Sequence, residues 1–265
     1  MAITTLDGVI AGCEPTQYFF KGTTYGVNTR SGSTFNAVGI PGAAVISTAG
    51  LGGEALTSYP GQIPFTNPPA GQKAYVARLA VAPRTTVATV LCDRVWHNSG
   101  FNVTTTAVQN FTGCPNFNRD VNNAVGVGEG IFVGIEYYTT GIATTVNVSM
   151  TYTNSAGVTG RTATANLPNS GGVGLFTGFS LQGNDTGVRS IQSASMGAAA
   201  AGGTVSFVAY RAITVVSSLA DTSATVIDPL TGGLPEIFND SVLFFIINGA
   251  SAGAPLSGSI TFAKG

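Results

Sequence analysis

The chain is 265 residues long, which is enough for one large domain with an appended arm or for two small domains. Charged residues make up only 9% of it, against roughly a quarter in an average soluble domain, while hydrophobic residues make up 44% and the formal net charge is −1. This balance excludes an intrinsically disordered chain. The 11 Lys and Arg residues are scattered singly, which argues against a nucleic-acid partner.

The first 73 residues are rich in Gly, Thr, Pro and Asn. Because Pro and Gly at this density break regular elements, the segment predicts extended backbone, turns and one short helix near its start. We expect residues 1–73 to form an extended, loop-rich arm. Its singly spaced aromatic side chains would dock onto the rest of the chain or onto a neighbouring subunit, and ordinary loops that wrap the same subunit are the alternative.

Alternating sequence begins at Ala74. The run 74–83 and the run 87–93 flank a short turn, which predicts a hairpin. Residues 131–138 form a further alternating strand. The strictest alternation lies at residues 145–153, and the turn sequence Asn154-Ser155-Ala156-Gly157 that follows predicts a hairpin with residues 158–165.

Later strands are predicted at residues 175–181, 188–195, 204–216, 242–248 and 259–263. The run Val242 to Ile247 does not alternate, so both of its faces should be covered, one by the core and one by another sheet or subunit. The spacing favours an all-β fold, a β-sandwich or jelly-roll-like domain over residues 74–265 that follows the N-terminal arm.

His97 is the only histidine, and Asp93, Arg94 and Trp96 precede it closely. A hydrolytic triad would need a serine on a strained turn and oxyanion donors, and the sequence has no Gly-x-Ser-x-Gly motif. We therefore interpret the segment as a structural anchor. In this interpretation Asp93 pairs with Arg94 or caps a turn, and Trp96 fills the edge of the core.

Other chemistry is not expected either. Cys13, Cys92 and Cys114 lack Cys-x-x-Cys spacing and match no zinc-ligand pattern with His97. The Gly126–Gly130 run precedes a strand rather than a helix, and the acidic residues are too dispersed to nominate a catalytic pair. The sequence thus predicts a protein that is not an enzyme, with no catalytic residue and no bound cofactor or metal. The apolar stretch 198–216 alternates at period two, so no membrane span is expected.

Several segments carry a resemblance to a known family. They are Thr5-Leu6-Asp7, Pro41-Gly42-Ala43-Ala44, Ser58-Tyr59-Pro60-Gly61-Gln62-Ile63-Pro64-Phe65, Leu91-Cys92-Asp93-Arg94-Val95-Trp96-His97-Asn98-Ser99-Gly100 and Tyr152-Thr153-Asn154-Ser155-Ala156-Gly157. Together they resemble structural proteins encoded among the head genes of tailed phages and prophages, and the segment around Trp96 is the most specific. The family has no catalytic residues that could be assigned to positions of this sequence, so the resemblance implies a structural role in the virion.

The resulting hypothesis is a capsid decoration or cement protein. It would be made in the cytoplasm of the host bacterium and would bind the major capsid protein on the capsid exterior as a trimer or dimer. The candidate subunit contacts are Tyr18, Phe19, Phe20, Tyr25, Phe35, Phe65, Phe244 and Phe245. The alternative is a tail-associated receptor-binding adhesin that recognises bacterial surface glycans.

Overall fold

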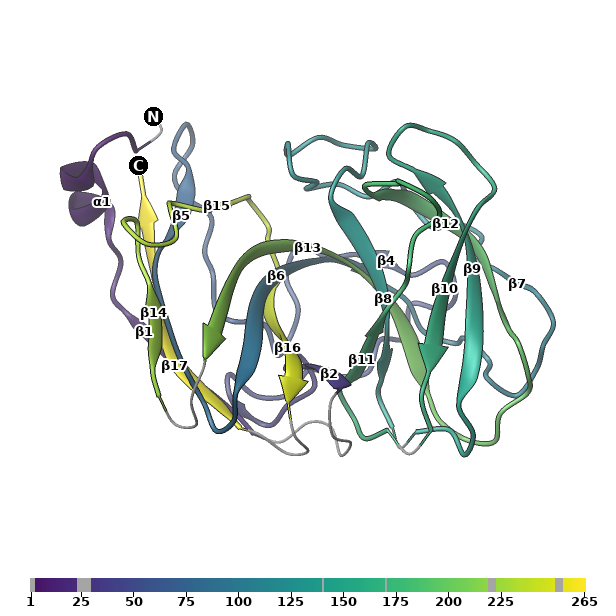
Figure 1. Cartoon of the computed structure of the whole chain (residues 1–265). Helices are drawn as coiled ribbons and strands as arrows, with labels where there is room; N and C mark the ends of the chain where they lie inside the picture. The colour runs from purple at the N-terminus through teal and green to yellow at the C-terminus, as the bar shows by residue number, and fades with distance from the viewer. Residues whose placement is uncertain (1–2, 23–29, 140, 170, 219–222, 251–254) are drawn as a thin grey trace.

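The computed structural model describes residues 3–22, 30–139, 141–169, 171–218, 223–250 and 255–265. Within these ranges the chain is almost entirely β, arranged in three antiparallel sheets, with one short helix (Figure 1). The predicted all-β class and the predicted helix near the start are confirmed. That helix, α1 (Leu6–Gly12), is capped by the Thr5 side chain, which accepts a hydrogen bond from the Gly8 amide at 3.1 Å.

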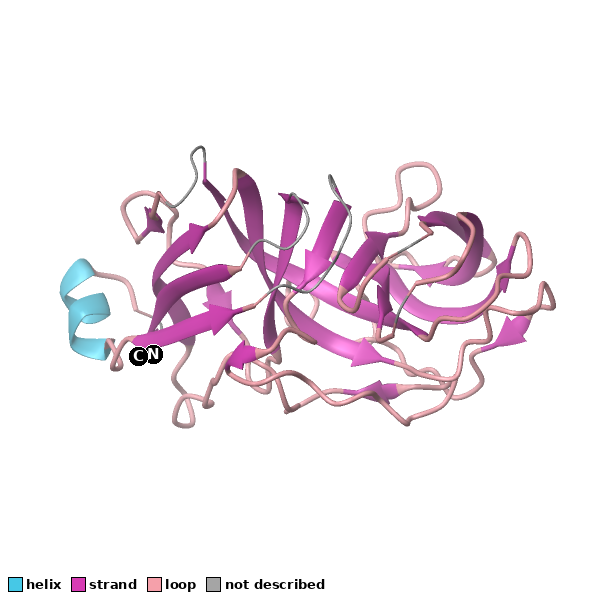
Figure 2. Cartoon of the chain, turned by 90° about the horizontal axis from the view of Figure 1, so that it is seen from below, coloured by secondary structure: helices cyan, strands magenta, loops and turns pink. Residues whose placement is uncertain are grey.

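Sheet A lies at one end of the molecule, where α1 also packs (Figure 2). Its strand order is β14-β5-β17-β1-β3, and β15 pairs with β5. The strands are β1 (Gln17–Lys21), β3 (Gly39–Ile40), β5 (Ala74–Pro83), β14 (Thr225–Ile227), β15 (Glu236–Ile237) and β17 (Leu256–Lys264).

Sheet B forms a barrel in the middle of the molecule. Its strand order is β13-β8-β11-β2-β16-β6-β4, and an additional pairing of β13 with β6 closes the first six of these strands into a ring (Figure 1). The strands are β2 (Arg30–Ser33), β4 (Glu54–Ala55), β6 (Val87–His97), β8 (Ile131–Tyr137), β11 (Leu175–Gly178), β13 (Val205–Ser218) and β16 (Leu243–Ala250). Closure leaves alternate side chains of each strand inside the barrel.

Sheet C lies at the opposite end from sheet A (Figure 1). Its strand order is β10-β9-β12-β7, and the strands are β7 (Gln109–Asn110), β9 (Val146–Asn154), β10 (Arg161–Leu167) and β12 (Val188–Met196). The β9–β10 pair is the hairpin that the strict alternation predicts.

One hydrophobic cluster connects the three sheets. It includes Phe19 of sheet A, Leu91 and Phe245 on the outside of the barrel, and Met150 of sheet C. The rings of Phe19 and Phe245 lie 4.8 Å apart between sheet A and the barrel. A second cluster, which includes Phe244, occupies part of the barrel interior. Both faces of β16 are therefore covered within this chain, as its unbroken apolar sequence predicts.

The predicted hairpin of residues 74–83 and 87–93 is wrong. The two runs are strands, but β5 pairs with β14, β15 and β17, whereas β6 pairs with β4, β13 and β16. The chain passes from sheet A to sheet B at Pro83, and the next amide, that of Arg84, donates to the carbonyl of Pro255 rather than across a hairpin turn. Proline brings no amide donor of its own to this junction.

The first 73 residues are loop-rich and contribute edge and central strands to the sheets of the same chain. From this segment, β1 pairs with β17 and β3 with β1 in sheet A, while β2 lies between β11 and β16 in the barrel and β4 pairs with β6. Sheets A and B therefore both combine strands from before and after residue 73.

Candidate functional site

Half of the predicted subunit contacts lie inside the chain. Phe19, Phe35, Phe244 and Phe245 are each at most 1% exposed, so they cannot contact another subunit in this fold, and their assignment is corrected to core residues. Phe19 and Phe245 join sheet A to the barrel, whereas Phe35 and Phe244 pack edge to face at 5.8 Å inside the barrel cluster. Alternation along β16 explains why Phe244 and Phe245 differ, because neighbouring side chains of a strand point to opposite faces.

The remaining predicted contacts have different surroundings. Tyr18 and Phe20 are 59% and 39% exposed, on the face of β1 opposite to Phe19. Phe65 is half-buried against the ring of Phe262 at 5.4 Å. Tyr25 lies outside the described residues. Tyr18 and Phe20 are therefore the predicted contacts that the structure leaves open to a partner.

Tyr18 and Phe20 belong to a larger surface, which we call the outer face of sheet A. Cross-strand neighbours form two rows on it: Ile40, Phe20, Ser257 and Ala82 in the first, and Tyr18, Ser259, Ala80 and Val226 in the second. Ile40 is 57% exposed and lies on the edge strand β3. Every side chain in the two rows is uncharged, and several are small. Sequence reasoning missed Ile40 and Val226, since only the pairing of their strands with β1 and β5 places them in these rows.

The borders of this outer face are defined by two arginines and by the helix. The exposed Arg84 lines a surface pocket together with Phe20, Ala82 and Ser257 of the first row. The guanidinium of Arg78 donates to the Ser259 hydroxyl at 3.2 Å beside the second row. Beyond it, Val9 of α1 packs against Ala77 and Ala263, which covers that end of the sheet. The rows themselves remain open to solvent, and an exposed apolar surface of this kind marks an interaction site in many proteins.

A buried lysine fixes the edge of the outer face from beneath. The amine of Lys21 donates to the carbonyls of Pro41, Gly42 and Gly61 at 2.8, 3.1 and 3.2 Å. Burial lowers the pKa of this amine to about 8. These bonds hold the segment around Ile40 against β1, which positions the first row.

The segment around Trp96 is an anchor, as the sequence predicts, but its ion pairs differ from the prediction. Trp96 is fully buried between the rings of Phe111 and Phe117. Asp93 pairs with Arg119 at 2.9 Å rather than with Arg94. Adjacent strand residues point to opposite faces, so the Asp93 and Arg94 side chains cannot meet across one peptide.

Arg94 lies in the barrel interior. Its guanidinium donates to Glu136 at 2.6 Å and to the Tyr138 hydroxyl at 2.8 Å, and it lies 4.2 Å from the centre of the Phe35 ring. The Arg94 and Glu136 side chains are fully buried, so the mutual attraction of the two charges offsets their desolvation only together with these further contacts.

Both nitrogens of the His97 ring are engaged. The Nε of Arg94 donates to Nδ1 at 3.3 Å, and Nε2 lies 2.9 Å from the Glu54 carboxylate. Since arginine donates only, Nδ1 must be the acceptor, so the proton is on Nε2 and is donated to Glu54. Burial and the nearby Arg94 charge lower the pKa of His97 to about 2. A ring held in this way has no free nitrogen with which to activate a serine.

The described ranges contain no candidate metal site and no candidate membrane span. No group of three or more His, Cys, Asp or Glu side chains there is close enough to hold a metal ion. No helix in the same ranges has the length and apolar character needed to cross a membrane.

Comparisons with known proteins return distant likenesses only. No protein-family model and no curated protein matches the chain. Among solved structures, the VP2 subviral particle of infectious bursal disease virus is 9% identical over 95% of this chain and 81% of that chain, with a TM-score of 0.22. A structure of the Gt strain of the same virus is 10% identical over 95% and 82%, with a TM-score of 0.20. Overlays this weak carry no argument about fold or function.

Proposed function

We propose that this chain is a structural, non-catalytic subunit of a tailed-phage particle that decorates or cements the capsid. It would bind the major capsid lattice, and copies of itself, through the outer face of sheet A. The single observation that carries this proposal is the pair of uncharged rows on that face, with Tyr18, Phe20 and Ile40 substantially exposed.

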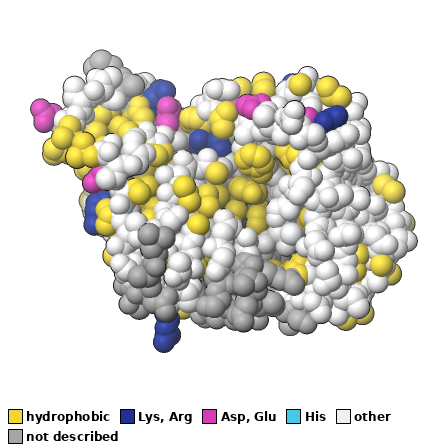
Figure 3. Space-filling model, viewed as in Figure 1, with side chains coloured by type: hydrophobic (Ala, Val, Ile, Leu, Met, Phe, Trp, Pro, Cys, Tyr) yellow, Lys and Arg dark blue, Asp and Glu magenta, His cyan; other side chains and the backbone are white. Residues whose placement is uncertain are grey.

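Physical chemistry favours such a surface for association. Burying uncharged side chains requires no desolvation of ions, and removal of apolar area from water contributes about 25 cal/mol per Å². A stable interface buries roughly 800 Å² on each partner. The small side chains of these rows let another sheet or lattice surface approach closely; they are Ala80, Ala82, Ser257 and Ser259. Charged side chains are also sparse on the side of the molecule that Figure 3 displays, which suits a subunit surrounded by neighbours.

The proposal assigns His97 and the Arg94–Glu136 pair to stability of the barrel, since the ring nitrogens of His97 and the guanidinium nitrogens of Arg94 are engaged within the chain. The resemblance of the segment around Trp96 to phage head proteins supports a place in the virion. The proposed location is the exterior of the capsid rather than the tail, and imaging of the particle tests this location directly.

Binding to shells tests the proposed surface. Phe20→Asp and Ile40→Asp each place a carboxylate on the first row, and Val158→Asp, in the exposed turn between β9 and β10, is the matched control. Capsid shells that lack this protein are incubated with each variant and sedimented. We expect both row variants to stay in the supernatant and the control to bind like the wild type, with unchanged circular dichroism for all.

Two results would contradict the proposal. If both row variants fold and still sediment with shells, the outer face of sheet A is not the contact. If antibody labelling of intact virions marks the tail, or if the protein is far scarcer than the major capsid protein in a stained gel, the adhesin alternative replaces decoration.

A further inference from the structure

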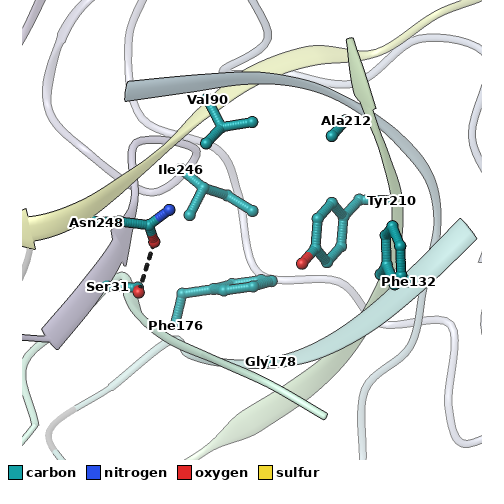
Figure 4. A pocket seen from close by; sticks show the side chains of 9 residues that line it. All are labelled: Ser31, Val90, Phe132, Phe176, Gly178, Tyr210, Ala212, Ile246 and Asn248. Carbon is teal, nitrogen blue, oxygen red and sulfur yellow. Dashed lines mark hydrogen bonds between the residues drawn. The ribbon is translucent and has the colours of Figure 1, made fainter. Parts of the chain in front are cut away.

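Residues from all six strands of the barrel surround a cavity of about 430 Å³ (Figure 4). Pockets that hold small ligands are typically of this size and are often formed at the mouths of β-barrels. The cavity lies between sheets A and C, inside the ring, and is separate from the outer face of sheet A.

Aromatic and aliphatic side chains form the floor of this pocket. Phe176 and Ile246 are 3% and 4% exposed, and the Tyr210 ring stands edge-on to Phe176 with the centroids 5.4 Å apart. Phe176 pairs with Glu136 on β8, and its ring extends over Gly134, where a Cβ atom would lie 2.2 Å from the ring. The floor is therefore fixed by packing and is present before any ligand arrives.

Polar groups stand above this floor on different strands. Ser31 of β2 donates to the Oδ1 of Asn248 on β16 at 2.6 Å, which orients the amide and leaves its Nδ2 group as a donor at the rim (Figure 4). The Tyr210 hydroxyl of β13 points into the cavity (Figure 4) and makes no hydrogen bond to any residue that the structure describes. Burial raises the pKa of Tyr210, so its hydroxyl stays protonated and can both donate and accept.

The lining also excludes some ligands. None of the described residues that line the cavity is charged, so an ionic ligand would lose its hydration without a counter-charge. A wholly apolar ligand would displace water from the Tyr210 hydroxyl and the Asn248 amide without replacing those hydrogen bonds. A neutral ring with one apolar C–H face and hydroxyl groups around its edge satisfies both the floor and the polar groups.

We propose that the barrel cavity binds a neutral saccharide ring, which packs against the exposed ring of Phe132 beside Tyr210 and is hydrogen-bonded by Tyr210 and Asn248. The proposal does not depend on the assembly surface, because the two sites share no residue. It adds a glycan-binding property to a subunit that would also occupy the virion surface.

Gly178, on the wall of the pocket, offers a way to block the site. A Cβ atom there would have the Tyr210 hydroxyl as its nearest neighbour at 3.9 Å, an ordinary contact, so Gly178→Val fills the cavity without straining the backbone. Gly42→Val is the matched control, since a Cβ atom at Gly42 meets nothing within 4 Å and lies outside the pocket.

Saturation-transfer NMR with glucose, galactose and N-acetylglucosamine is the test, followed by titration of any sugar that gives a signal. We expect saturation to pass to a sugar from the wild type and from Gly42→Val, and not from Gly178→Val. Tyr210→Phe and Asn248→Ala should each weaken binding about tenfold, the effect of one lost hydrogen bond. Thermal melting confirms that each variant is folded.

The proposal is overturned if none of the sugars receives saturation, or if Gly178→Val folds and binds as well as the wild type. Binding of an uncharged aromatic probe such as indole, with no binding of any sugar, would also overturn it, since the pocket would then select apolar rings.

Discussion

Acidification is expected to destabilise this protein through the single imidazole of His97. In the folded chain its pKa lies at about 2, against 6.5 in an unfolded chain, because burial and the Arg94 charge disfavour the protonated ring. The Glu54 carboxylate acts in the opposite direction, but its side chain is 44% exposed, so water screens its charge. The geometry agrees, since Nδ1 already accepts a hydrogen bond from Arg94.

The sign and size follow from proton linkage. Above pH 6.5 both states carry neutral His97, and the stability due to this residue is fully present. As the pH falls, His97 binds a proton in the unfolded chain but stays neutral in the folded chain. The free energy of unfolding therefore decreases by up to about 1.4 kcal/mol per pH unit. Over two pH units below 6.5 the loss is about 2.7 kcal/mol. The lower limit of this pH window lies above the ordinary pKa of carboxyl groups, which is roughly 4.

Urea unfolding at several pH values in this window measures the effect, and His97→Gln is the comparison, because glutamine has no group that titrates there. The wild type should lose stability with falling pH, whereas the variant should change far less. Since the chain has one histidine, NMR can follow the folded imidazole directly. A native-state ring that titrates near pH 6.5, or an equal pH slope in both proteins, would refute the reasoning.

Two substitutions test other contacts. Glu136→Gln leaves the buried Arg94 guanidinium without its counter-charge and should reduce the free energy of unfolding by about 3–5 kcal/mol in denaturant titrations; a loss below about 1 kcal/mol would mean that water reaches the pair. Gly53→Ala puts a Cβ atom 2.3 Å from the Trp96 ring at a φ of +68°, so it should lower Tm by several degrees and shift the tryptophan fluorescence, and an unchanged Tm would show that the loop relaxes easily.

Local periodicity predicted the strands well. The alternation at residues 146–152 became β9, and the unbroken run at Val242 to Ile247 became β16, covered on both faces. These patterns succeed because side-chain direction depends only on neighbouring residues. The same rule, applied to Gln17–Lys21, would have separated the buried Phe19 from the exposed Tyr18 and Phe20.

Pairing partners were not predictable in the same way. The β5 and β6 runs look like a hairpin locally, yet each pairs with strands far away in the sequence, β17 and β13 among them. Barrel closure had one indirect signal, the unusual length of the run at residues 204–216, because a long strand can pair with β8 and β6 along different parts of its length. The pocket arises from closure of the barrel, and the outer face of sheet A arises from strand pairing, so the sequence of no single segment predicts either feature.

The central position of β17 in sheet A has a consequence for biosynthesis. This strand lies between β5 and β1, and it pairs Gln17 with Ile260, so both neighbours wait until Leu256–Lys264 has left the ribosome. β2 likewise waits for β16. Until then β1 and β5 present unpaired backbone edges, and folding dominated by such distant contacts is slow. The nascent chain therefore depends on protection by chaperones, or on rapid synthesis of the later strands that complete these sheets, more than a protein built of local hairpins does.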